Sequence, residues 1–231
     1  MFTKLLAYEI RSRYRADARS FGAFIAVIAV AAGIVAAGLP GISGSTAVLA
    51  YALCALTPVA CAIAALADYW KTLYGQRGYF TMSLPVSGKV IFWAKNTRIM
   101  IECLLALALA VGGIIAVASA AAWSDGISLA EYTAGPRSVV AGMPTSTVVI
   151  MIVVQVLVSL SWLVQGSAVM SIGAEGRFNH MGFGAPIIGF VLLYIVNQVL
   201  STVGTFFLPL SVTTDGHFST EIMWTSYLAT M

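Results

Sequence analysis

Residues 68–98 read DYWKTLYGQRGYFTMSLPVSGKVIFWAKNTR and form a polar, basic and aromatic segment between two long apolar blocks. Five of the 12 Lys and Arg residues lie in this segment, against one acidic residue, Asp68. In membrane proteins such an excess of basic residues marks a cytoplasmic loop. Large apolar side chains, Tyr79, Phe80, Met82 and Leu84, occupy its middle. A free loop seldom carries such a patch, so we expect this segment to bind a partner.

The composition of the whole chain predicts an all-α, polytopic membrane protein. Of the 231 residues 60% are hydrophobic and only 9% are charged, whereas about a quarter of the residues of a soluble domain are charged. A helix needs about 20 apolar residues to cross a hydrocarbon core of ~30 Å. The interval from Arg19 to Asp68 therefore holds two spans, with a turn at Gly38, Pro40, Gly41 and Gly44. The predicted spans are 21–39, 46–67, 99–123, 147–173 and 183–209.

The distribution of Lys and Arg predicts the orientation. Residues 1–20, 68–98 and 174–182 together hold eleven of them, and the alternate connecting segments hold only Arg137. We therefore expect a multi-pass protein of the cell membrane whose N-terminus lies in the cytoplasm. The formal net charge of +3 then reflects topology, and no nucleic-acid partner is expected. Residues 1–20 are too charged for a signal peptide, so the first span is expected to stay in the mature protein.

Residues 1–20 predict an amphipathic helix. Four basic residues lie on one side of it: Lys4, Arg11, Arg15 and Arg19. An interfacial helix on the inner leaflet would have this pattern. Glu9, Arg13 and Asp17 interrupt the apolar side, so part of the helix is expected to face protein. A simple positive-inside anchor explains the basic residues equally well.

From Tyr74 to Ser87 the loop reads Tyr-Gly-x-x-Gly-Tyr-aromatic-Thr-x-Ser-Leu-Pro-Val-Ser, and Lys95 follows in the next helix. This pattern resembles the first intracellular loop of membrane subunits in the type-2 ABC exporter permease family. The resemblance implies a coupling helix that docks on a separate ATP-binding subunit, which would hold ATP and Mg, and it implies a second permease chain. It suggests a peptide, antimicrobial or amphiphile as substrate. Members commonly have six spans, so residues 210–231 either lie outside or begin a sixth.

Within the 73–90 loop a short helix is expected from Arg77 to Ser83, ended by Pro85. Aromatic, Met and Arg residues of this kind are enriched in protein interfaces. An aromatic belt on the inner leaflet is the alternative. The residues predicted to bind the partner are Tyr74, Arg77, Tyr79, Phe80, Met82, Leu84 and Pro85.

Catalysis by the chain itself is not expected. The stretch Ser83 to Val90, SLPVSGKV, lacks the first glycine of a phosphate loop and has Val90 at the magnesium-binding position. Gly41-Ile42-Ser43-Gly44 resembles the nucleophile motif of rhomboid proteases. A serine nucleophile needs a histidine base, and only His217 is predicted on the same side of the membrane as Ser43. A non-transporting scaffold or sensor subunit is the other alternative to a permease.

Polar residues inside the predicted spans are the remaining candidates. Arg98 and Glu102 are spaced i, i+4 and are expected to form a structural ion pair near the cytoplasmic end, within reach of the interface. Amides within spans either bond to other helices or line a translocation path; these are Gln155, Gln165, Asn197 and Gln198. The three cysteines, Cys54, Cys61 and Cys103, predict buried thiols rather than a disulfide scaffold or a metal site.

Overall fold

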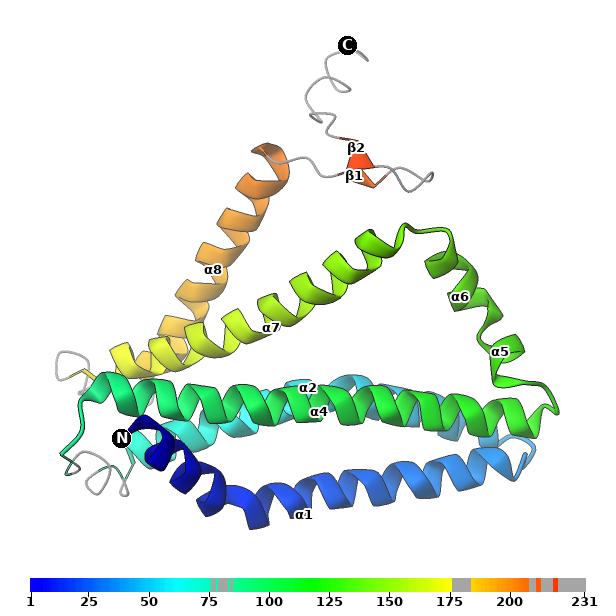
Figure 1. Ribbon diagram of the computed structural model, residues 1–231, viewed down its shortest axis with the longest axis horizontal. Helices are drawn as coiled ribbons and strands as arrows, with labels where there is room; N and C mark the ends of the chain where they lie inside the picture. Colours follow the sequence, from blue (N-terminus) through cyan, green and yellow to red (C-terminus); the bar gives the residue numbers. More distant parts are fainter. Residues whose placement is uncertain are drawn as a thin grey trace. The chain divides into compact units, whose positions relative to one another are not determined.

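The computed structural model describes residues 1–75, 78, 83, 85–175, 184–207, 211–212 and 218–219 (Figure 1). The helices are α1 (Phe2–Ala36), α2 (Ser43–Leu73), α4 (Gly88–Ser124), α5 (Leu129–Tyr132), α6 (Ala134–Ala141), α7 (Thr145–Gly173) and α8 (Gly184–Phe207). Two short strands, β1 (Ser211–Val212) and β2 (Phe218–Ser219), pair antiparallel. In the described part of the chain five helices, α1, α2, α4, α7 and α8, are long and apolar enough to cross a membrane. The prediction of an all-α, polytopic membrane protein is confirmed.

The chain divides into two compact units, residues 1–135 and residues 136–231. In the first unit α1 and α2 both pack along α4, and they also contact each other. Alanines of all three helices lie in or against one buried cluster that also contains Ile28, Cys54 and Val117; these alanines are Ala31, Ala47, Ala50 and Ala116. Small residues let helix backbones approach closely in lipid, where packing drives association. The Ala-rich helices α1 and α2 therefore pack closely against α4 and against each other.

A short turn joins α1 to α2, as the glycines predicted. Gly38 and Gly41 have φ values of 62° and 78°. This left-handed conformation is accessible to glycine without the steric cost that other residues bear. The chain therefore reverses direction between Ala36 and Ser43, and two adjacent antiparallel helices result.

Helix α1 continues without interruption from the basic residues into the first span. Residues 1–20 are thus the first turns of a 35-residue helix, and in Figure 1 these dark-blue turns run at an angle to the rest of it. The Ser20 hydroxyl donates to the carbonyl of Ala16 at 3.2 Å. Side-chain bonds of this kind are associated with bends in helices.

The loop between α2 and α4 is shorter than the sequence predicted. Residues 68–73 belong to α2 and residues 88–98 belong to α4, so the connection spans residues 74–87 rather than 68–98. The helices extend because charged side chains on them pair within the bundle, as described below. At Gly75 a Cβ atom would lie 2.6 Å from the carbonyl oxygen of Lys71. Only glycine fits this turn.

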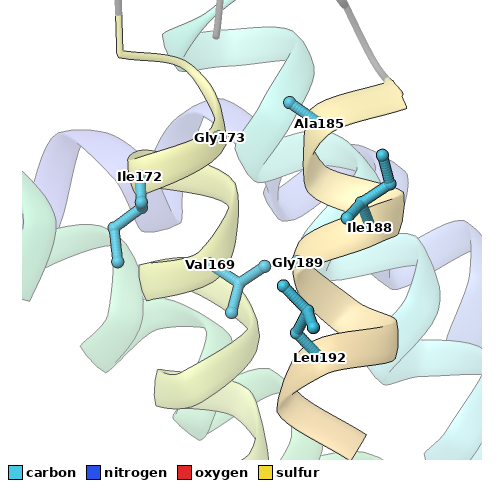
Figure 2. A pocket seen from close by; sticks show the side chains of 7 residues that line it. All are labelled: Val169, Ile172, Gly173, Ala185, Ile188, Gly189 and Leu192. Carbon is cyan, nitrogen blue, oxygen red and sulfur yellow. The ribbon is translucent and has the colours of Figure 1, made fainter. Parts of the chain in front are cut away.

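The second unit contains α7 and α8, which pack against each other. A Cβ atom on Gly173 would lie 2.9 Å from Pro186 Cδ, and one on Gly189 would lie 2.6 Å from Val169 Cγ1. The missing side chains let the two helices approach closely. Beside these contacts lies an open cavity of about 280 Å³ with an apolar lining, shown in Figure 2. Its lining residues are Val169, Ile172, Gly173, Ala185, Ile188, Gly189 and Leu192.

Candidate functional site

A set of charged side chains joins the three long helices of the first unit, near the ends of α2 and α4 that the 74–87 loop connects. We call it the charged cluster. Helix α1 contributes three residues, α2 one and α4 three. Its members are Glu9, Arg13, Asp17, Asp68, Lys95, Arg98 and Glu102.

Lys95 links α4 to both neighbouring helices. Its Nζ donates to Glu9 Oε1 on α1 at 2.9 Å and to Thr72 Oγ1 on α2 at 3.0 Å. The side chains of Lys95 and Glu9 are only 5% and 11% exposed. Solvent therefore screens this ion pair weakly, and each charge depends on the other for compensation.

Arg98 and Asp68 form the second junction. The Arg98 guanidinium donates to Glu102 Oε2 at 2.8 Å and to Asp68 Oδ2 at 3.3 Å. The other oxygen of Asp68, Oδ1, lies 2.9 Å from the Arg13 guanidinium on α1. Asp68 therefore bridges a cation from α1 and a cation from α4. Through this carboxylate and through Lys95, the ends of α1, α2 and α4 are held together.

The sequence predicted one of these pairs and missed the others. Arg98 and Glu102 lie together as their i, i+4 spacing suggested, but Arg98 is 4% exposed instead of extending to the interface. The reason is Asp68, which offers the guanidinium a second carboxylate inside the bundle. Glu9 and Arg13 interrupt the apolar side of α1, and the expectation that part of this helix faces protein is confirmed by their bonds to α4 and α2.

A cavity of about 180 Å³ lies beside the charged cluster, between α1 and α4. Three of its lining residues are charged: Asp17, Arg98 and Glu102. The others are largely apolar: Ile10, Tyr14, Ala18, Phe21, Ile101 and Leu105. Asp17 has only a loose ion pair, 3.9 Å from Arg13 Nε. Asp17 is therefore the most weakly paired residue of the charged cluster, and it lines the cavity.

Two of the residues predicted to bind a partner are described in the loop. Tyr74 is half-buried, with its ring centroid 5.2 Å from that of Trp70 and 6.4 Å from that of Tyr69. Pro85 is exposed. Tyr74 therefore contributes to packing at the end of α2. The other five lie outside the described residues: Arg77, Tyr79, Phe80, Met82 and Leu84.

The four amides predicted to pack or to line a path separate into two kinds. Asn197 Nδ2 donates to Gln165 Oε1 at 2.9 Å, joining α8 to α7. Gln155 and Gln198 are exposed on α7 and α8. Asn197 and Gln165 thus pack between helices, whereas Gln155 and Gln198 make no such side-chain bond to another helix within the described part of the chain.

Comparisons with protein-family models, with curated proteins and with solved structures found no match. The Ser43 hydroxyl donates to the carbonyl of Leu39 at 3.0 Å, and both histidines lie outside the described residues, so the protease alternative stays untested. Cys54, Cys61 and Cys103 are free thiols. Within the described ranges no group of three or more His, Cys, Asp or Glu side chains is arranged to hold a metal ion.

Proposed function

We propose that this chain is the permease subunit of an ATP-driven exporter of the type-2 ABC class. Three features support the proposal: the sequence of the loop from Tyr74 to Ser87, the five apolar helices, and the Lys and Arg asymmetry that favours a cytoplasmic loop. ATP and Mg would be bound by a separate subunit, and a second permease chain would complete the translocation path. The substrate class suggested by the resemblance is a peptide, an antimicrobial or another amphiphile.

The observation that carries the proposal is the position of the charged cluster relative to this loop. Asp68 lies six residues before the loop begins, and Lys95 and Arg98 lie within the first three turns of the helix that follows it. Because these residues are paired and mostly buried, a displacement of the loop would move the ends of three helices together. Helix ends that are joined in this way would pass on the movement of a loop on which another subunit docks.

The test is copurification from the membranes of the source cells with a tag on this chain. We expect an ATP-binding subunit to copurify and its ATP turnover to change when the chain is reconstituted with it. The variant Tyr79→Ala/Phe80→Ala should lose this association while still inserting in the membrane. A residue that anchors an interface contributes at least ~2 kcal/mol, so binding should weaken roughly thirtyfold or more.

Trp123→Ala is the matched control for this variant. Trp123 is an aromatic residue that is 79% exposed, and it lies at the opposite end of α4 from the loop. Its loss should leave association unchanged. Equal ATPase copurification with both variants would refute the docking role of the loop. Association without any change in ATP turnover would instead favour the scaffold or sensor alternative.

A further inference from the structure

The outer side of the first turns of α1 carries only positive charge. Lys4, Arg11, Arg15 and Arg19 are all exposed, and none of the four forms an ion pair with another described residue. At 100° per residue they fall within an arc of about 80°. We call these four residues the basic face of α1.

The acidic residues of α1 point the other way. Glu9 bonds to Lys95, and Asp17 lies next to Arg13, which itself pairs with Asp68. On the same helical projection Glu9, Arg13 and Asp17 lie roughly opposite the basic face. The fold therefore removes every carboxylate from the side where the four cations are exposed. Their charges stay uncompensated within the first unit.

The position of the basic face favours lipid as its partner. Arg19 and Ser20 directly precede the apolar residues 21–36 of the same helix, which places Arg19 at the level of the headgroups when α1 enters the bilayer. Tyr8 and Tyr14, exposed at 68% and 67%, lie among or beside the basic residues. Tyrosine is enriched at the membrane–water interface, where one end of its side chain meets water and the other meets hydrocarbon.

We propose that the basic face of α1 binds the phosphate groups of anionic lipids in the adjacent leaflet. Guanidinium groups bind phosphate through paired hydrogen bonds, and Arg11, Arg15 and Arg19 recur every four residues along one side of the helix. Juxtamembrane basic residues gain affinity from anionic headgroups, by about fivefold per residue. This surface belongs to α1 alone, and its function does not require an ATP-binding partner.

The test uses the purified full-length chain in neutral detergent. It is titrated with phosphatidylglycerol or with phosphatidylcholine of the same acyl chains, and bound lipid is counted by native mass spectrometry. Wild type should bind phosphatidylglycerol at least tenfold more tightly than phosphatidylcholine. Arg11→Gln/Arg15→Gln/Arg19→Gln should lose this preference, weakening phosphatidylglycerol binding by on the order of a hundredfold.

Two further variants make the result specific. The control Lys71→Gln/Lys89→Gln/Arg137→Gln also removes three exposed cations, all outside α1, and should keep the preference. The variant Arg11→Lys/Arg15→Lys/Arg19→Lys keeps the positive charges and should retain most of the preference for phosphatidylglycerol. Equal binding of the two lipids by wild type, or an equal loss in the control, would overturn the proposal. Thermal unfolding in detergent, unchanged in all three variants, would show that lost binding does not reflect lost folding.

Discussion

The ion pair between Lys95 and Glu9 gives the sharpest prediction for stability. Replacing Lys95 with Met removes the only cation bonded to Glu9 among the described contacts and leaves a carboxylate that is 11% exposed. It also removes the donor to Thr72 Oγ1. Breaking a buried pair by removing one partner costs about 3–5 kcal/mol. We expect a loss of this size in the free energy of unfolding, measured by reversible denaturation in mixed detergent and SDS micelles.

A double-mutant cycle separates this pair from general disruption of the core. Glu9→Met/Lys95→Met should recover much of the loss, because apolar side chains of similar volume replace buried ion pairs at little or no cost. The control cycle uses Arg13 and Asp17, whose side chains are 32% and 23% exposed and whose nearest charged atoms lie 3.9 Å apart. Its coupling should be below about 1 kcal/mol. A loss below 1 kcal/mol in Lys95→Met, or additive losses in the first cycle, would refute the reasoning.

Two other predictions concern helix packing. Gly113→Ala should destabilise the first unit by about 1–3 kcal/mol, because the added Cβ would lie 2.7 Å from Cys54 Sγ. A Cβ added at Gly112 would meet no atom within 4 Å, so Gly112→Ala should be neutral or stabilising. The same denaturation assay compares the two variants, and equal effects would contradict the contact between Gly113 and Cys54. Asn197 and Gln165 can be replaced with Leu, singly and together, in a double-mutant cycle. Their coupling in the free energy of unfolding should be about 0.6 kcal/mol and no more than ~1.7 kcal/mol. A coupling of zero would mean that the 2.9 Å hydrogen bond between them contributes nothing to stability.

The spans followed from the sequence because lipid imposes a simple length rule. Uninterrupted apolar stretches predicted α7 and α8 to within two residues at each end, with predicted spans of 147–173 and 183–209 against Thr145–Gly173 and Gly184–Phe207. The rule fails where charged residues continue a helix. Helix α4 begins at Gly88, well before the predicted start at residue 99, because Lys95 and Arg98 find partners within the bundle.

The charged cluster was only partly predictable for a related reason. Arg98 and Glu102 are four residues apart, so their pairing is local and can be inferred from spacing. Lys95 and Glu9 are 86 residues apart, and their contact depends on how α1 packs on α4. The usable signal was indirect: Glu9, Arg13 and Asp17 follow one side of a helix where apolar residues were expected. Such a pattern predicts a polar partner without identifying it.

The proposed permease requires the 74–87 loop to lie on the cytoplasmic side of the membrane, where ATP is present. Ser87 and Asp125 flank the two ends of the 37-residue α4, and both are exposed. Single cysteines at these positions, in a chain with Cys54, Cys61 and Cys103 replaced by Ala, can be treated in intact cells with a membrane-impermeant thiol reagent. We expect labelling of Asp125→Cys in sealed cells and labelling of Ser87→Cys only after the membrane is opened. Labelling of Ser87→Cys in sealed cells, with Asp125→Cys protected, would place the loop away from ATP and contradict the proposed permease.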